Sequence, residues 1–258
     1  MNVILCQLDV AWENPEANHA RAASLSEGAS VAPGSLVVLP EMFATGFSMN
    51  TAVTAQDAGG ASEQFLAGLA RRHGVTVLGG LAVRGPDGRA RNQALAFGPD
   101  GAELARFTKL HSFTLGAEHE HYAAGNDVVL FDWGGLKVAP LVCYDLRFPE
   151  AFRIAVRRGA QMFVVIANWP VVRIQHWSTL LRARAIENQA FVVGVNRCGR
   201  DPVLQYPGRS LVVDPLGEII ADAGEGEGVC SATLNVATLH QWRNGFPALR
   251  DVRADPVA

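Results

Sequence analysis

The sequence predicts an α/β protein, a four-layer α-β-β-α sandwich in which two stacked mixed sheets lie between outer helices. Short β-rich segments alternate with helical segments along the chain. The strands are continuous apolar runs, as expected where both faces of a sheet are covered. The order β-α-β-α-β-β occurs twice, once before and once after about residue 125. Because no Pro/Gly/Ser-rich linker separates the halves, we expect residues 1–258 to form a single domain.

Apolar runs and turn residues locate the elements. Pro15 favours a helix start, and Gly74 and Gly159 favour helix ends. We expect helices at residues 15–29, 62–74, 149–159 and 175–189. We expect strands at residues 2–10, 35–41, 75–85, 91–98, 102–109, 128–135, 136–143, 161–169 and 191–198, a hairpin at 210–223 and a closing strand at 228–235.

Composition and charge exclude several classes of protein. A chain of 258 residues, 49% hydrophobic and 18% charged, can bury an ample core without metal or disulfides. Its net charge of −3 offers no broad basic surface to nucleic acid or an anionic membrane. No apolar run approaches the ~20 residues of a membrane span, and no export signal is visible. Four widely spaced cysteines without a CxxC pair indicate reduced thiols, so we expect a cytoplasmic protein.

Three reactive side chains follow predicted strands. Glu41 ends the run SLVVLP, Lys109 ends AELARFT, and Cys143 ends LKVAPLV. Catalytic groups of layered α/β folds gather beyond the carboxyl ends of strands. Taken alone, Cys143 would be a small buried hydrophobe and Lys109 a solvated charge. Together, a thiol nucleophile, a cation and a proton-transferring carboxylate suit amide hydrolysis.

The sequences around these residues resemble the carbon–nitrogen hydrolase (nitrilase) superfamily. They are LPEMFATGF around Glu41, FTKLHSF around Lys109 and PLVCYDLRFPE around Cys143. The resemblance continues through ANWP at 167–170, HWSTLLRARAIENQAFVVGVNR at 176–197 and PGRSLVVDPLGEII at 207–220. It covers nearly the whole chain in order, implies the α-β-β-α sandwich, and is greatest to the omega-amidase branch. Members of that branch hydrolyse the terminal amide of 2-oxo dicarboxylic acid monoamides.

The resemblance also implies roles for the site residues. Glu41 would be the general base, Lys109 the cation beside the oxyanion, and Cys143 the nucleophile. A second glutamate would be Glu118, with Glu120 as the alternative. The implied enzyme is a homodimer that needs no metal or organic cofactor.

The sequence also contains candidates for substrate binding. A 2-oxo acid carboxylate would need a cation, and the candidates are Arg147, Arg173 and Arg209. Arg147 could instead form a structural or inter-subunit ion pair. The backbone N–H of Tyr144 would assist Lys109 at the oxyanion. Candidates for an apolar pocket are Phe43, Phe47, Tyr144 and Trp169, of which Trp169 is favoured because ANWP ends a strand.

Other functions compete with amide hydrolysis. His111 and the HEH sequence at 119–121 could suggest a metal-dependent hydrolase, but HxH alone is a weak signal and HExxH is absent. An inactive family member acting as a scaffold would not need the Glu41–Lys109–Cys143 set. Neither GxGxxG nor a GxxxxGK[ST] loop occurs, which disfavours nucleotide binding. The same three groups could also act on a nitrile, an N-carbamoyl amino acid or a deaminated-glutathione-like amide.

Overall fold

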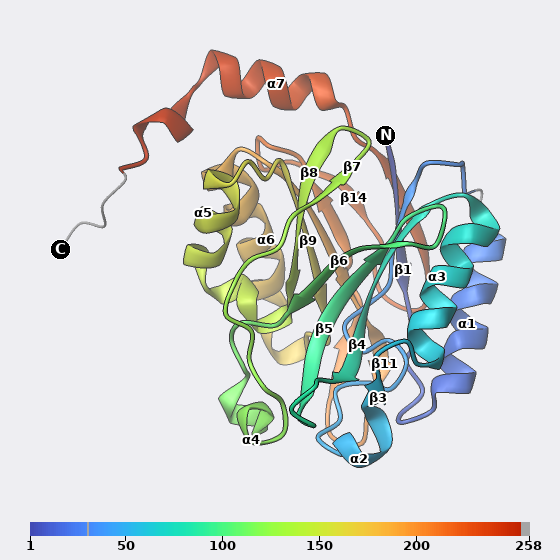
Figure 1. Ribbon diagram of the computed structural model, residues 1–258. Helices are drawn as coiled ribbons and strands as arrows, with labels where there is room; N and C mark the ends of the chain where they lie inside the picture. Colours follow the sequence, from blue (N-terminus) through green and yellow to red (C-terminus); the bar gives the residue numbers. More distant parts are fainter. Residues whose placement is uncertain (30, 254–258) are drawn as a thin grey trace.

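Two β-sheets pack face to face between outer helices in the computed structural model, which describes residues 1–29 and 31–253 (Figure 1). The first sheet has the strand order β15-β1-β2-β4-β5-β6, and β3 pairs with β4 at one end. Its strands are β1 (Asn2–Gln7), β2 (Leu36–Val38), β3 (Gln56–Asp57), β4 (Thr76–Arg84), β5 (Ala90–Phe97), β6 (Glu103–Thr108) and β15 (Gly228–Thr233).

The second sheet has the order β14-β13-β10-β9-β8-β7, and all its strands come from the second half of the chain. Its strands are β7 (Phe131–Trp133), β8 (Leu136–Val142), β9 (Met162–Ala167), β10 (Phe191–Asn196), β13 (Leu211–Val213) and β14 (Ile219–Asp222). The strands β8, β9 and β10 are parallel, so each connection between them crosses from one end of the sheet to the other. A separate antiparallel hairpin joins β11 (Cys198–Arg200) to β12 (Gln205–Pro207).

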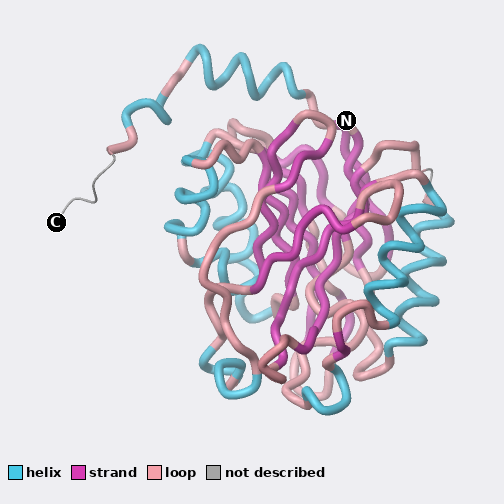
Figure 2. The backbone as a smooth tube through the Cα atoms, in the orientation of Figure 1, coloured by secondary structure: helices cyan, strands magenta, loops and turns pink. Residues whose placement is uncertain are grey.

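Helices form the two outer layers (Figure 2). The helices α1 (Pro15–Gly28) and α3 (Ala61–His73) cover the first sheet, and α5 (Pro149–Arg157) and α6 (Ile174–Asn188) cover the second. Asn14 caps α1 by accepting a hydrogen bond from Ala17 N, and Gly74 ends α3 at φ 63°. The remaining helices are α2 (Thr51–Thr54), α4 (Glu118–His121), α7 (Val236–Gly245) and the 3₁₀ turns η1 (Thr114–Gly116), η2 (Cys143–Arg147), η3 (Val171–Arg173) and η4 (Ala248–Asp251).

The main core lies between the sheets. Leu5 and Val38 of the first sheet belong to the same buried cluster as Val142, Val164 and Val193 of the second. All six residues of β9 are buried, because one face meets the other sheet and the opposite face meets helices. The predicted four-layer fold is therefore confirmed.

The structure corrects the expected place of the last strand. Residues 228–235 were expected to close the second half, but β15 pairs antiparallel with β1 at the edge of the first sheet. The helix α7, which follows β15, was not expected at all. Its Asn235 cap, whose side chain accepts from Ala237 N, is a recognisable start signal.

The carboxyl ends of several strands lie at the same edge of the sandwich. In the first sheet β2 and β4 are parallel, and two antiparallel pairings turn β6 back into the same direction. The segments after β2, β6 and β8 therefore reach neighbouring positions. Across residues 1–29 and 31–253, every helix is too short or too polar to cross a membrane.

Candidate active site

A buried ion cluster lies beyond the ends of β2 and β6. Glu41 and Lys109 are 0% and 3% exposed, and Lys109 Nζ donates to Glu41 Oε1 at 3.1 Å. The same ammonium donates to Glu118 Oε1 at 3.0 Å. Glu120 is exposed on α4, so Glu118 is the glutamate that faces Lys109. One ammonium thus serves two buried carboxylates.

Backbone and amide groups complete the coordination of both carboxylates. Asn168 donates to Glu41 Oε2 from its backbone N at 2.8 Å and from Nδ2 at 3.2 Å. Phe113 N donates to Glu118 Oε2 at 2.6 Å. Asn92 Nδ2 donates to Oε1 of Glu41 at 2.7 Å and to Oε1 of Glu118 at 2.9 Å. These fixed donors hold both carboxylates in one orientation.

Cys143 stands on a sharp turn between β8 and η2. Its φ of +46° is unusual for a residue with a side chain, so the surroundings must hold it in place. The buried Asp145 does this by accepting from Val142 N at 3.2 Å and from His111 Nδ1 at 2.8 Å. Since His111 follows Lys109 closely in sequence, Asp145 links the turn that carries Cys143 to the loop that carries Lys109.

The electrostatics assign opposite protonation states to the acid groups. Burial alone would raise the pKa of Glu41, but Lys109, Asn92 and Asn168 outweigh it and hold that pKa below its ordinary value of 4.5. Burial raises the pKa of the Cys143 thiol well above 9.0, Glu41 adds to this, and Lys109 opposes it. Burial would lower the pKa of Lys109, but Glu41 and Glu118 raise it overall. At neutral pH the site therefore holds a thiol, an ionised base and an ammonium.

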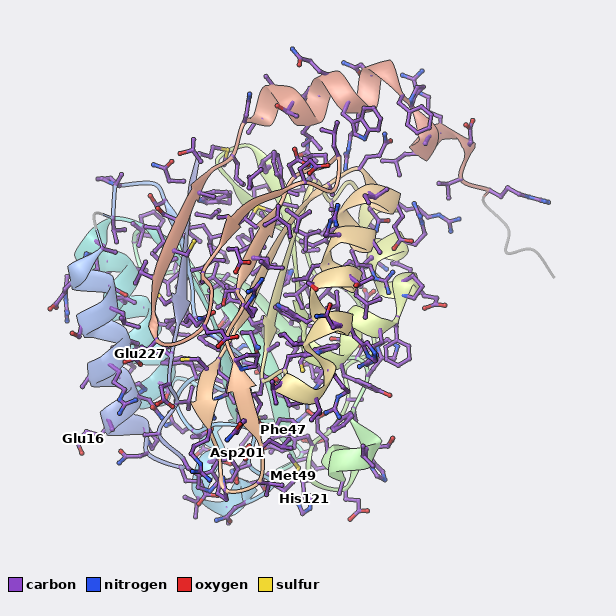
Figure 3. The ribbon with its side chains drawn as sticks, turned by 180° about the vertical axis from the view of Figure 1, so that it is seen from behind. Glu16, Phe47, Met49, His121, Asp201 and Glu227 are labelled. Atoms are coloured by element: carbon purple, nitrogen blue, oxygen red, sulfur yellow. The ribbon has the colours of Figure 1, made fainter. Side chains whose placement is uncertain are left out.

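A cavity of about 400 Å³ contains Glu41, Lys109 and Cys143 in its wall. This volume lies within the range of small-molecule sites. Most of the residues predicted from sequence to bind substrate line it; they are Phe47, Tyr144, Arg147, Trp169 and Arg173. Figure 3 shows the lining residues Phe47, Met49 and Asp201 together at one end of the sandwich, beside the β11–β12 hairpin.

Two arginines of the cavity lie over aromatic rings. The guanidinium carbon of Arg147 is 4.8 Å from the Trp169 ring centroid, and that of Arg173 is 5.5 Å from the Phe113 ring centroid. Arg147 Nη2 also lies 3.2 Å from His176 Nδ1. Within the described part of the chain neither arginine pairs with a carboxylate, so the alternative of an intrachain ion pair for Arg147 does not apply.

Two sequence candidates lie elsewhere. Phe43 is fully buried in the core under α1 and α3, where its ring centroid is 5.9 Å from that of Phe65. Arg209 does not line the cavity; it pairs with Asp222 at 2.7 Å on the surface.

The histidines weighed as metal ligands are separated. His111 stacks on Phe148 at 3.8 Å and bonds to Asp145, whereas His119 and His121 are exposed on α4. Among residues 1–29 and 31–253, no group of three or more His, Cys, Asp or Glu side chains has a geometry suited to a metal ion.

Sequence reasoning missed two buried amides and part of the wall. Asn168 lies within the noticed sequence ANWP, and Asn92 is a polar residue inside the apolar strand RNQALAFG. Both are buried polar groups, which is the signal that could have found them. The wall residues Trp12, Asp201 and Tyr206 come from loops and the β11–β12 hairpin, whose approach to the site is a long-range feature.

Comparison with known proteins agrees with this fold. Residues 2–244 match the family described as carbon-nitrogen hydrolase. The chain is 40% identical over 253 residues to the omega-amidase YafV of Yersinia enterocolitica, covering 97% of this chain and 96% of that protein. It is 33% identical over 250 residues to the 2-oxoglutaramate amidase of Bacillus subtilis, covering 96% of each.

A solved structure is similar over the whole chain. It is a CN-hydrolase superfamily protein from Xanthomonas campestris, which superposes with a TM-score of 0.94 at 36% identity and covers 100% of this chain and 99% of that one. The chain therefore belongs to the carbon–nitrogen hydrolase (nitrilase) superfamily and is an amidase of that family.

Proposed function

We propose that this amidase releases ammonia from the terminal amide of a short 2-oxo dicarboxylic acid monoamide through a thioester on Cys143. The supporting observation is one cavity that holds Cys143 and the Glu41–Lys109 pair together with Arg147 and Arg173. A substrate of this class carries an amide at one end and a carboxylate at the other. The similarity to an omega-amidase and a 2-oxoglutaramate amidase supports the same substrate class.

Glu41 activates the thiol during attack. Because the pKa of Cys143 is raised and that of Glu41 is lowered, the thiol keeps its proton until the substrate arrives. As sulfur adds to the amide carbon, its proton passes to Glu41. General base catalysis of this kind contributes about 10²- to 10⁴-fold to the rate.

Lys109 and Tyr144 stabilise the oxyanion of the tetrahedral intermediate. The Lys109 ammonium is held by two carboxylates and keeps a third hydrogen for the substrate oxygen. The Tyr144 N–H is in the first turn of η2, where backbone donors lack intrahelical acceptors. Removing one oxyanion donor costs about 2.7–4 kcal/mol of transition-state stabilisation.

Collapse of the intermediate breaks the carbon–nitrogen bond. Glu41 returns the proton to the leaving nitrogen, ammonia departs, and the acyl group remains on Cys143 as a thioester. Water then attacks the thioester and gives a proton to Glu41. Expulsion of the sulfur takes that proton back, so the thiol is restored and the acid product leaves.

Arg147 and Arg173 bind the substrate carboxylate in this proposal. Stacking on Trp169 and Phe113 fixes each guanidinium at the cavity while leaving its N–H groups available. Phe47 and the Tyr144 ring provide apolar walls for the carbon chain.

Ammonia release from 2-oxoglutaramate and 2-oxosuccinamate tests this function. We expect turnover by the wild type, none by folded Cys143→Ala, and normal turnover by Cys230→Ala, a matched control on β15. Equal rates in wild type and Cys143→Ala would reject the nucleophile. Turnover only of nitriles, N-carbamoyl amino acids or deaminated glutathione would reject the substrate class.

We also propose that the enzyme is a homodimer. Large apolar side chains are exposed on the outer helices of the second sheet, with Ile154 of α5 42% and Ile186 of α6 52% exposed. A shared interface would remove them from water. Light scattering at micromolar concentration should give twice the 27.6 kDa chain mass, and a mass of one chain would reject the dimer.

A further inference from the structure

The side chain of Asn92 occupies a central position in the ion cluster. It extends from β5 on the face shared with Ala94, toward the second sheet, and is 1% exposed. Its amide nitrogen lies 2.7 Å from Glu41 Oε1 and 2.9 Å from Glu118 Oε1. Its backbone oxygen accepts from Lys109 N at 2.9 Å. One residue of a rigid strand thus contacts all three charged residues.

The two carboxylates share the same pair of donors. Oε1 of Glu41 and Oε1 of Glu118 each receive one hydrogen bond from Lys109 Nζ and one from Asn92 Nδ2. The cluster contains more buried carboxylates than cations, so Lys109 balances only part of its negative charge. A second cation would correct this imbalance but would compete with Lys109 for the oxyanion. A neutral amide supplies the two extra hydrogen bonds without adding charge.

The orientation of the amide is fixed by its acceptors. Turning the side chain over would place Oδ1 against two carboxylate oxygens, which is repulsive. In the observed orientation Oδ1 of Asn92 is buried without a hydrogen-bond partner. An unpaired buried oxygen weakens folding, so the residue is poorly explained by stability alone.

We propose that Asn92 is a positioning residue of the amidase, whose amide holds the carboxylates of Glu41 and Glu118 correctly spaced around Lys109. This inference deepens the proposed function and rests on it for the role of Glu41. Asn92 does not line the substrate cavity, so it acts through the carboxylates. The pKa of Glu41 responds to this contact, because the Asn92 hydrogen bond is one of the factors that lower it.

The other titratable groups near Glu41 must also be considered in the pH dependence of the rate. Lys109, Glu118 and Cys143 share the site with it, and Tyr122 lies nearby. Burial raises the pKa of Tyr122 to about 12, so it does not titrate in the acid range. The acid limb of the rate profile therefore reports Glu41, whose charge is stabilised by Lys109, Asn92 and Asn168.

Two substitutions and one control test the inference. Asn92→Ala removes the amide, and the nearly isosteric Asn92→Asp replaces it with a third acid group. Gln93→Ala is the control, because Gln93 is the next residue of β5, is 6% exposed, and donates to Thr108 Oγ1 at 2.9 Å on the other face. A cooperative thermal melting transition is the criterion that each variant is folded. The quantity compared is then kcat/KM as a function of pH.

We expect kcat/KM at neutral pH to fall about 10²-fold in Asn92→Ala, because the base is displaced. The midpoint of the acid side of its kcat/KM profile should move up by about one pH unit. In Asn92→Asp this midpoint should move further, because a third carboxylate repels the charge on Glu41. Gln93→Ala should keep the wild-type acid-side midpoint even if its Tm is lower. A wild-type limb in both Asn92 variants would overturn the inference.

Alkylation of Cys143 by iodoacetamide separates this inference from the substrate proposal. Peptide mass analysis identifies the alkylated cysteine, and the rate against pH should shift in the Asn92 variants as kcat/KM does. A shift in an enzyme that does not hydrolyse 2-oxo acid amides would reject the substrate but uphold the role of Asn92. Normal hydrolysis together with an unshifted alkylation profile would reject Asn92 and leave the function standing.

Discussion

Replacing Lys109 by methionine removes the only cation that contacts the two buried carboxylates within the described residues. Methionine has a similar length and shape but no charge. Glu41 and Glu118, which are 0% and 1% exposed, would then face each other with only Asn92 between them. We expect Lys109→Met to lose turnover and also to be strongly destabilised, which distinguishes it from an ordinary loss of a catalytic group.

The size of the effect follows from the burial of the pair. Removing one partner of a buried ion pair costs about 3–5 kcal/mol, because the other charge stays buried and unpaired. Each kcal/mol lowers Tm by about 2–4 °C in a domain of roughly this size. We therefore expect Lys109→Met to melt about 6–20 °C below the wild type at pH 7.

The loss should diminish as the pH falls. In the wild type the pKa of Glu41 is below 4.5, so its contribution to stability is present above pH 4.5 and is lost as the pH falls through the lowered pKa. In the variant Glu41 has lost the Lys109 charge that lowers its pKa, so its folded pKa rises and its protonation relieves the repulsion. Only the effect in the variant acts between pH 7 and pH 4.5, and it should reduce the difference in Tm over that range.

Differential scanning calorimetry from pH 4.5 to pH 8 measures this difference. Lys137→Met is the matched control, since Lys137 is the only other lysine, is half exposed, and pairs with Asp132 at 3.6 Å. A surface pair contributes at most about 1 kcal/mol, so the control should lose no more than about 4 °C. Equal losses in both variants, or a loss for Lys109→Met that does not change with pH, would refute the reasoning.

Three further predictions concern turnover. Glu41→Gln should lower kcat by about 10²- to 10⁴-fold, measured as ammonia release, while a loss under tenfold would exclude it as the base. The wild-type kcat/KM should stay level from pH 7 to pH 5 and decrease only below 4.5, since the pKa of Glu41 is lowered; a midpoint near pH 7 would contradict this. Arg173→Met and Arg147→Met should each lower kcat/KM for 2-oxoglutaramate about 10- to 100-fold and leave an uncharged short amide nearly unaffected, whereas equal losses on both substrates would argue against carboxylate binding.

Local signals were sufficient for most elements of this fold. The helix predicted at 62–74 is observed at Ala61–His73, and the strand predicted at 136–143 is observed at Leu136–Val142. These segments combine apolar periodicity with Gly or Pro boundaries, so each can be recognised from its own residues. The pairing of β15 with β1 depends on residues more than 220 positions apart, for which a single sequence contains no local signal.

The same contrast applies to the site. Glu41, Lys109 and Cys143 each follow an apolar strand, so their position at one edge could be predicted. The β11–β12 hairpin was missed because Pro202 and the polar residues around it lack strand alternation. Asn92 and Asn168 were missed because a buried amide has meaning only when its acceptors are known.

Trapping the covalent intermediate tests the central claim most directly. Wild-type enzyme mixed with 2-oxoglutaramate and quenched in acid within milliseconds should gain the mass of one acyl group, located on the peptide that contains Cys143. Cys143→Ala should gain none and release no ammonia. Steady ammonia release by Cys143→Ala, or an acyl group on Cys6, Cys198 or Cys230 instead, would contradict the account.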